Sequence, residues 1–201
     1  MAPEDRRAEI QRVGGDVFSQ QSYAAVSIAD IARAAGVSAP LIVFYFGSKR
    51  SLYLKIIQAA IDDIAAGLQA LPGPASLERL HASVLFYAEY ARTHRAGFLS
   101  LLRGGVEAAL PEAAAMIEAM RTEITGWILS DLAAASGDTV RTSTQIAVRG
   151  YLGYVDAAIA HWLGLPEEER STVDDEEIAR LAVGAFTGGL NASSKPSRSE
   201  I

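Results

Sequence analysis

The 201-residue sequence contains no cysteine, and this absence removes several kinds of chemistry. Disulfide bridges, thiol nucleophiles and zinc sites with cysteine ligands all need that side chain. Proline is also scarce, with seven residues, whereas half of the residues are hydrophobic and 21% are charged. This composition favours a globular, all-α protein over a disordered one.

Long apolar runs are absent as well. No stretch approaches the ~18 consecutive apolar residues that suggest a membrane span. The start, MAPEDRRAEI, contains acids and is followed by no apolar stretch, so we expect no secretory signal. We therefore expect a cytoplasmic protein with no membrane partner. His81, His94 and His161 show no metal-ligand spacing, so we expect no metal and no cofactor.

Charge is unevenly divided along the chain. Residues 1–57 contain seven Lys or Arg and five acids, a net charge of +2, whereas residues 58–201 contain 11 and 19, a net charge of −8. A mildly basic head and an acidic body suit a protein in which only the head approaches phosphates. Chance is the alternative explanation, because +2 is a small excess.

The spacing of apolar residues predicts a first amphipathic helix over residues 4–20. After a connection at 21–26, Ser27 and Asp30 resemble a capping box, which starts a short second helix. Gly36 ends that helix, because glycine readily adopts the left-handed backbone conformation. Ser38 is then expected to cap the next segment. Two short helices joined by a glycine turn form the helix-turn-helix pattern.

The segment Ala39-Pro40-Leu41-Ile42-Val43-Phe44-Tyr45-Phe46 is apolar throughout, and periodicity alone does not distinguish a strand from a helix here. Pro40 suits the first turn of a helix, and a lone strand among helices would lack a partner. We therefore interpret the segment as a third short helix.

The remainder of the chain predicts six more helices, which makes about nine in total. Ser48 caps the fourth, and Pro72 stops it. The others are expected at about 76–94, 98–103, 111–136, 142–164 and 174–190, with a turn at 95–97 and with Gly104 and Gly105 closing the short helix at 98–103. Residues 191–201 are polar and are expected to be a disordered tail.

The segment from Ser27 to Leu54, SIADIARAAGVSAPLIVFYFGSKRSLYL, closely resembles the helix-turn-helix signature of the TetR family of transcriptional regulators. The match covers roughly residues 8–56 and rests on Ile28, Ile31-Ala32, Ala35-Gly36-Val37-Ser38, Tyr45-Phe46, Ser48-Lys49 and Leu52. The body matches by helix layout and by the less specific segments LLRGG and RGYLGYVDAAIAHW. The resemblance implies a DNA-binding head over 1–50 and a ligand-binding and dimerisation body over 51–190.

The resemblance also implies that a recognition helix at about 38–45 lies in the major groove of an operator. Phosphate contacts would come from Ser27, Tyr45 and Lys49. Base contacts would come from the recognition helix, so the expected DNA-contacting set is Ser27, Ser38, Ala39, Pro40, Leu41, Val43, Phe44, Tyr45 and Lys49. Val43 and Ala39 depart from the usual family pattern, which has an aromatic and a polar or basic residue there. This apolar surface could contact thymine methyl groups but offers few hydrogen bonds to bases. Sequence specificity could then depend on DNA shape or on Arg6 and Arg7.

For the body, the resemblance implies a homodimer built on the last two long helices, whose small residues permit close approach, and a palindromic operator. It further implies a repressor that a small-molecule inducer releases. An apolar pocket for that inducer is predicted from Phe86, Tyr90, Phe98, Leu102, Met116, Met120, Trp127, Tyr151 and Tyr154. Ordinary core packing is the alternative role of each of these residues.

The sequence bears on two other classes of function. We do not expect an enzyme, because there is no cysteine, no phosphate-binding glycine loop and no histidine paired with an acid and a nucleophile. A ligand-binding or interaction protein of the same fold with weakened DNA binding stays an alternative because of the departures at Val43 and Ala39.

Overall fold

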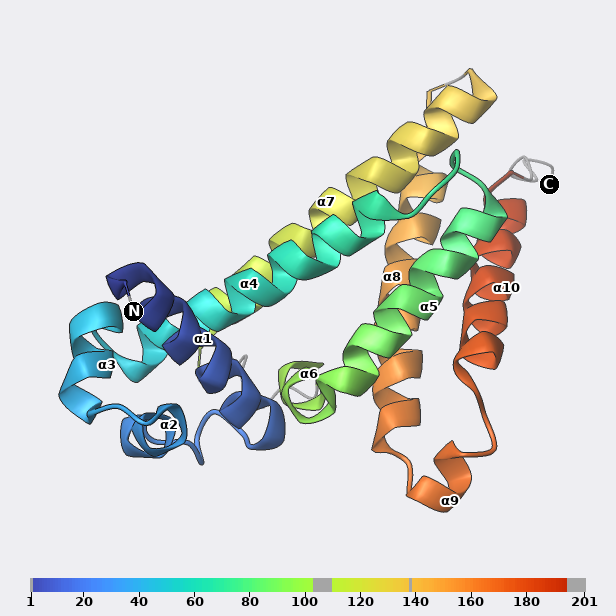
Figure 1. Ribbon diagram of the computed structural model, residues 1–201. Coiled ribbons are helices and arrows are strands. Elements are labelled where there is room, and N and C mark those ends of the chain that lie inside the picture. Colours follow the sequence, from blue (N-terminus) through green and yellow to red (C-terminus); the bar gives the residue numbers. More distant parts are fainter. Residues whose placement is uncertain (1, 103–109, 138, 195–201) are drawn as a thin grey trace. The chain divides into compact units, whose positions relative to one another are not determined.

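The computed structural model describes residues 2–102, 110–137 and 139–194. Residues 100, 102 and 194 are described without their side chains. These residues form an all-α fold with no strand (Figure 1). The helices are α1 (Pro3–Gln20), α2 (Ile28–Ala35), α3 (Ala39–Phe46), α4 (Lys49–Ala70), α5 (Leu77–Thr93), α6 (Arg95–Leu102), α7 (Pro111–Ser136), α8 (Thr142–Gly164), α9 (Glu167–Arg170) and α10 (Asp175–Ser194).

The chain divides into two compact units, each made of two sequence segments. The first unit comprises residues 1–66 and 91–117, and the second comprises 67–90 and 118–201. The helices α4, α5 and α7 each contribute to both units. The expected functional boundary at residues 50 and 51 stays a prediction.

The first unit begins with the predicted three-helix head. Ser27 and Asp30 form the expected capping box, and Gly36 ends α2 with φ of 63°. The chain bends by 105° between α2 and α3, within the range of about 90–120° that is typical of helix-turn-helix pairs. The segment 39–46 is helical, as its Pro40 indicated. The core of the head is apolar and includes Ile10, Phe18, Ile31, Ile42, Phe46, Leu52 and Tyr53.

The turn expected at residues 95–97 is wrong, because α6 already begins at Arg95. Gly97 does not terminate a helix. A Cβ atom built on it would lie 3.4 Å from the Cα atom of Ser19 in α1, so Gly97 lets two backbones pack closely. The closing glycines, Gly104 and Gly105, lie outside the described residues.

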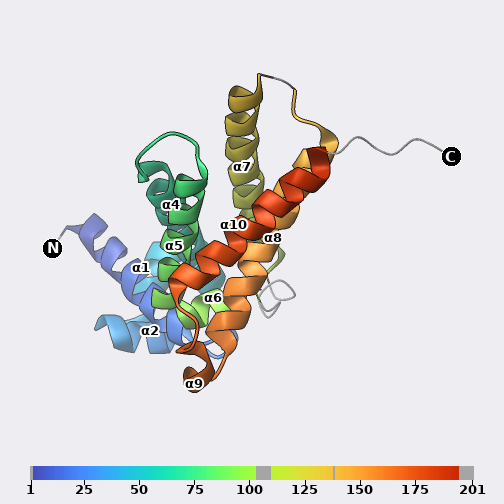
Figure 2. The same cartoon turned by 90° about the vertical axis from the view of Figure 1, so that its right-hand side faces the viewer.

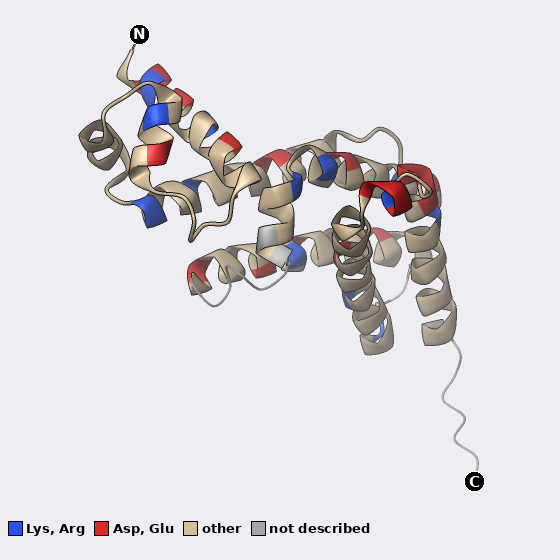
Figure 3. Cartoon of the chain, turned by 90° about the horizontal axis from the view of Figure 1, so that it is seen from below, with Lys and Arg blue, Asp and Glu red and all other residues tan. Residues whose placement is uncertain are grey.

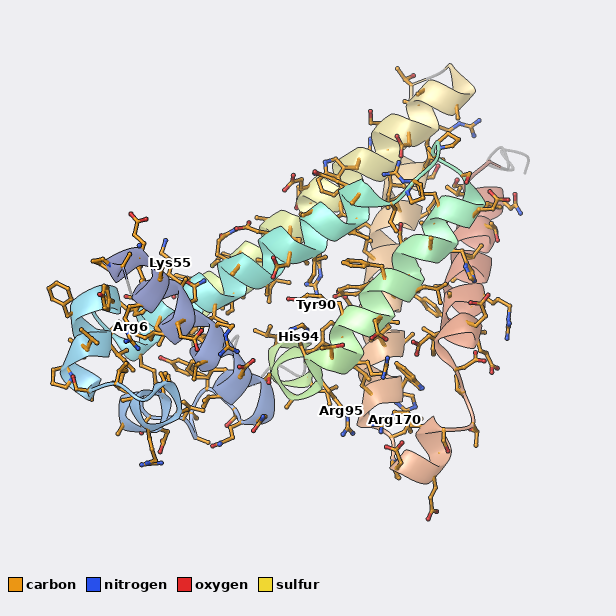
Figure 4. The ribbon with its side chains drawn as sticks, viewed as in Figure 1. Arg6, Lys55, Tyr90, His94, Arg95 and Arg170 are labelled. Atoms are coloured by element: carbon orange, nitrogen blue, oxygen red, sulfur yellow. The ribbon has the colours of Figure 1, made fainter. Side chains whose placement is uncertain are left out.

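In the second unit, α8 and α10 run side by side (Figures 1 and 2). Their shared core contains Val148, Tyr151, Val155, Ile159, Ile178, Ala182 and Phe186. The short helix α9, which the sequence pattern does not predict, precedes α10. The indole nitrogen of Trp162 donates to the backbone oxygens of Arg170 and Val173, at 3.4 and 3.1 Å (Figure 4 labels Arg170). These bonds hold the connection between α8 and α10.

The C-terminal helix differs from the expectation in its length. Its residue Leu181 is 52% exposed. The helix α10 continues to Ser194, so four residues of the expected disordered tail are helical, and residues 195–201 lie outside the described residues. Within the described ranges, no single helix is long and apolar enough to cross a membrane, and the bent pair of α2 and α3 passes that test by length and composition only.

Candidate nucleic-acid interface

The outward face of α3 is the surface that the sequence predicts for base contact. Val43 is 47% exposed and Phe44 is 80% exposed, and Pro40 is exposed beside them. Ala39 and Leu41 are half-buried. The opposite face is fixed in the core, since Ile42 and Phe46 are buried. The helix therefore holds an apolar surface in a defined position.

Ser27, the predicted phosphate contact at the start of α2, uses its hydroxyl within the protein. The hydroxyl donates to Asp30 Oδ2 at 2.5 Å and accepts from the Asp30 amide at 3.2 Å. The bond from the Ser27 hydroxyl, and secondly one from the Ser27 backbone amide at 3.0 Å, hold the pKa of the Asp30 carboxyl below its usual range, so Asp30 is negatively charged at neutral pH. Arg33 lies 3.0 Å from Asp30 and offsets that charge. For a phosphate, α2 therefore offers the amides of Ile28 and Ala29 at its start and Arg33 in its last turn more than the Ser27 hydroxyl.

Lys49 was predicted to meet a phosphate, but its ammonium group is engaged inside the head. Lys49 Nζ donates to the backbone oxygens of Tyr23 and Val26, at 2.9 Å each. It also lies 4.2 Å from the centroid of the Tyr23 ring. The side chain thereby ties the first turn of α4 to the connection that precedes α2. Periodicity could not reveal this contact, because it joins residues more than twenty positions apart.

Ser38 and Tyr45 are the predicted contacts whose side-chain hydroxyl groups make no hydrogen bond with the described residues of the head. Ser38 stands at the N-cap position of α3 and is exposed, but its side chain makes no capping hydrogen bond, contrary to expectation. The Tyr45 ring is half-buried between Phe44 and Phe46, with centroid distances of 5.4 and 6.5 Å. Both hydroxyl groups can therefore donate to a phosphate or a base.

Other cations of the first unit lie on the elements around α3. Arg7 in α1 stacks over the Phe46 ring at 5.6 Å. Arg50 forms an ion pair with Glu112 of α7. Arg6 and Lys55 are labelled in Figure 4, on α1 and α4. Arg33, in the last turn of α2 and 77% exposed, was missed by the sequence reasoning. An arginine one residue before the Ala-Ala-Gly end of that helix was the available signal.

The nine residues predicted to line a ligand pocket are divided between the two units. Phe98, Leu102 and Met116 belong to the first unit. Phe98 is buried and Met116 packs against the head core, whereas the side chain of Leu102 lies outside the described part. The other six belong to the second unit and are Phe86, Tyr90, Met120, Trp127, Tyr151 and Tyr154.

Within the second unit, the six predicted pocket residues differ in their environments. Phe86 and Tyr90 lie one turn apart on α5, with ring centroids 6.4 Å apart. The Phe86 ring packs so closely on Gly67 that a Cβ atom there would clash with it. Tyr151 is buried against Phe186, and burial raises the pKa of its hydroxyl far above the usual range. Tyr154 is 39% exposed.

A polar cluster in the second unit was missed by the sequence reasoning. The Tyr87 hydroxyl donates to Asp156 Oδ1 at 2.8 Å, and Arg121 Nε and Nη2 donate to Asp156 Oδ2 at 2.8 and 2.7 Å. Burial, and secondarily the Asp156 charge, raise the pKa of Tyr87 well above its usual range. Glu118 pairs with Arg149, whose Nη1 atom is buried without a hydrogen-bond partner among the described residues. The lone acid in the apolar run YVDAAIA was the available signal.

The bent pair of short helices, the glycine corner and the exposed face of α3 define a helix-turn-helix DNA-binding protein. Comparison with known families agrees with this class. Residues 13–56 match the family described as "Bacterial regulatory proteins, tetR family". Residues 77–186 match the family described as "Tetracyclin repressor-like, C-terminal domain". The chain belongs to the TetR family and is a DNA-binding transcriptional regulator.

Individual relatives extend over most of the chain. The HTH-type transcriptional activator FasR of Mycolicibacterium smegmatis is 27% identical over 190 residues, which is 94% of this chain and 84% of FasR. The regulator RutR of Escherichia coli is 27% identical over 57% of this chain and 58% of its own length. A crystal structure of a tetR-family regulator from Streptomyces coelicolor has a TM-score of 0.81 at 28% identity and covers 96% of this chain and 84% of that one.

Proposed function

We propose that the protein binds a palindromic double-stranded DNA operator as a homodimer and acts as a repressor that an apolar small molecule releases. The observation that carries the DNA part is the outward face of α3, where Val43 and Phe44 are exposed on a helix whose other face is buried. In this proposal α3 lies in the major groove. Ser38, Ala39, Pro40, Leu41, Val43 and Phe44 face the bases, and Tyr45, Arg33 and the amides at the start of α2 face phosphates.

The faces of α8 and α10 that point away from their shared core support the dimer. Ile146 is 68% exposed and Leu181 is 52% exposed. Exposed small residues accompany them, and a Cβ atom on Gly153 or Gly184 would meet nothing within 4 Å. These glycines therefore do not serve packing within the chain. After its first turns α10 carries no charge, as Figure 3 shows for the helix that leads to the C-terminus. Such a surface suits close approach of a second copy.

The ligand part of the proposal rests on the aromatic residues of the second unit and its polar cluster. Binding sites for small molecules combine an apolar lining with a few fixed polar groups. Trp127 and Met120 of α7 and Phe86 of α5 supply apolar side chains. Tyr87, Arg121 and Asp156 supply hydrogen-bonding groups that are already held in place. A ligand that favours one state of the body would shift the protein towards head spacings that miss the half-sites, which lie about 34–36 Å apart.

The test uses the full chain, the DNA upstream of its own gene and fluorescence anisotropy at several salt concentrations. We expect tight binding that weakens steeply with salt, as phosphate contacts require. Tyr45→Phe removes one hydroxyl and keeps the ring packing, and we expect it to weaken binding about tenfold, since a hydrogen bond to a charged group contributes about 1.5 kcal/mol or more. Thr122→Val, which removes an exposed hydroxyl on α7 in the second unit, is the matched control and should bind normally.

A promoter-reporter assay and light scattering test the rest of the proposal. Expression of the protein should lower reporter output, and an apolar compound that changes the fluorescence of Trp127 and Trp162 should restore it. A rise in output would instead assign an activator, the role named for FasR. The protein should be a dimer at micromolar concentration, and a strict monomer would overturn the dimer. Ile146→Glu should favour the monomer, because it places a charge on the proposed interface.

A second candidate function is a ligand-binding protein with weakened DNA binding. The observation that favours it is the chemistry of α3, which has no charged side chain, together with the engagement of Lys49 inside the head. Absence of salt-sensitive binding to any DNA fragment, with ligand binding retained, would support this function and overturn the first.

A further inference from the structure

The exposed part of α3 is unusual among the surfaces of this protein. The described residues include six exposed large hydrophobic side chains, and two of them, Val43 and Phe44, are neighbours on this eight-residue helix. Phe44 is the most exposed of the six, at 80%. Pro40 precedes Phe44 by one helical turn and is exposed as well. Together these three side chains form what we call the apolar tip.

The helix that carries the apolar tip is fixed by the core of the head. Ile42 and Phe46, one turn apart on the same helix, are buried and fix its rotation. The Phe44 ring meets the Tyr45 ring edge to face at a centroid distance of 5.4 Å. Gly47 ends the helix directly behind the tip, with its amide bonded to the Val43 oxygen at 2.7 Å. An aromatic ring exposed in this way presents contact area at little cost in conformational entropy.

The chemistry of the apolar tip limits what it can recognise. Hydrogen-bonded base recognition uses Arg, Lys, Asn, Gln or acidic side chains on the edges of bases. Pro40, Val43 and Phe44 have no polar side-chain atom. Ser38 is the polar side chain nearest to them at the start of α3, and Tyr45 is half-buried. The one apolar feature that distinguishes bases in the major groove is the C5-methyl group of thymine.

We infer that this protein identifies its operator chiefly through thymine methyl groups, which pack against Phe44 with Val43 and Pro40. The inference rests on the proposed function, because it assigns the base chemistry to the same DNA-contacting surface. The occupant is DNA because the tip belongs to the second helix of the helix-turn-helix, the element that enters the groove in this class. Each operator half-site then contains thymines whose methyl groups, more than their hydrogen-bonding edges, set the affinity.

The experiment first selects bound duplexes from a randomised DNA library with the full chain. The recovered duplex is then resynthesised with deoxyuridine in place of single thymines, which removes only the methyl group. We expect at least one position per half-site at which deoxyuridine weakens binding about fourfold, the effect of leaving one methyl-sized group unburied. Deoxyuridine outside the bound footprint should change nothing and serves as the DNA control.

The protein variants assign the effect to the tip. Phe44→Ala should weaken binding to the thymine duplex about tenfold, within the range of one lost base contact. On the same variant, the change to deoxyuridine should cost less than about twofold, because the surface that reads the methyl is gone. Leu77→Ala is the matched control, since Leu77 is 47% exposed on α5 and lies outside the head. Circular dichroism of each variant verifies its helical fold.

The outcomes separate the inference from the proposed function. Equal affinity for thymine and deoxyuridine duplexes at every position would overturn the inference and leave operator binding intact. Normal DNA binding by Phe44→Ala would also overturn it and would assign the tip to another partner. A chain that selects no duplex and shows no salt-sensitive binding would overturn the proposed function itself.

Discussion

Replacing Lys49 with methionine removes an ammonium group and keeps a side chain of similar length and apolar bulk. The structure places that ammonium between the backbone oxygens of Tyr23 and Val26, each 2.9 Å away, and over the Tyr23 ring. If these contacts are its main role, Lys49→Met loosens the start of α2. If Lys49 instead contacts a phosphate, the substitution weakens DNA binding and leaves the stability of the free protein unchanged.

The size of the stability effect follows from these contacts. A hydrogen bond from a charged donor contributes about 1.5–3 kcal/mol, and an exposed cation–π contact contributes about 0.5–1 kcal/mol. The site is part-buried, so water replaces some of the lost bonds. We therefore expect Lys49→Met to lower the free energy of opening this region by about 2–3 kcal/mol.

Hydrogen exchange in the full chain measures this opening directly. Peptides that cover residues 21–35 should exchange about 30- to 150-fold faster in Lys49→Met, which is the same 2–3 kcal/mol expressed as a ratio. Lys55→Met is the matched control, because Lys55 is an exposed residue on the same helix. Both tryptophans, Trp127 and Trp162, lie in the second unit, so their fluorescence should not change and reports that this unit is intact.

The salt dependence of DNA binding gives the decisive contrast. We expect Lys49→Met to weaken binding with an unchanged slope of log K against log salt, because the start of α2 is displaced but no phosphate contact is lost. A slope that becomes less negative by about 0.9, with hydrogen exchange unchanged, would refute this reasoning and establish Lys49 as a phosphate contact.

Two further substitutions test the corner of the head and the polar cluster of the second unit. Gly36→Ala should destabilise the head by about 1–2 kcal/mol in urea unfolding followed by circular dichroism, because Gly36 has φ of 63° and an added Cβ atom would meet no neighbouring atom. The control Gly15→Ala, in the helix α1, should stabilise the head by up to about 1 kcal/mol. If both substitutions changed the free energy of unfolding in the same direction, the backbone explanation would be contradicted. Asp156→Asn should cost about 2–3 kcal/mol in urea unfolding followed by tryptophan fluorescence, because it removes the nearer of the two carboxylates that pair with the part-buried Arg121 and leaves only Glu118, at 3.7 Å. The exposed Asp131→Asn is its control, and an equal small effect of both would show that the ion pair contributes no net stability.

Much of the local structure follows from neighbouring residues and was predictable for that reason. The Ser27 and Asp30 capping box, the left-handed Gly36 and the helical segment after Pro40 each depend on contacts within a few positions. The bounds of α7 and α8 agree with the predicted ranges 111–136 and 142–164. The short helix α9 was missed, because four residues, EEER, are too few to show a helical period.

Long-range contacts account for the roles that were assigned differently. Gly97 suggested a turn, but it faces the backbone of α1 and permits close packing within a helix. Asp156 was overlooked, because its partners Tyr87 and Arg121 come from two other helices. The predicted pocket residues fall in both units, since α6 belongs to the first unit and α7 is divided between the two. Sequence spacing contains no information on these pairings.

The sequence by itself determined the all-α class, the helix-turn-helix and the apolar character of α3, because helix signals and side-chain chemistry are local. Only the tertiary structure decided which polar groups remain for DNA. Lys49 carried the expected ammonium group, but the fold brings the backbone oxygens of Tyr23 and Val26 to it. Phe44, by contrast, is 80% exposed. A side chain is available to a partner only when the folded chain leaves it unengaged, and that depends on residues distant in sequence.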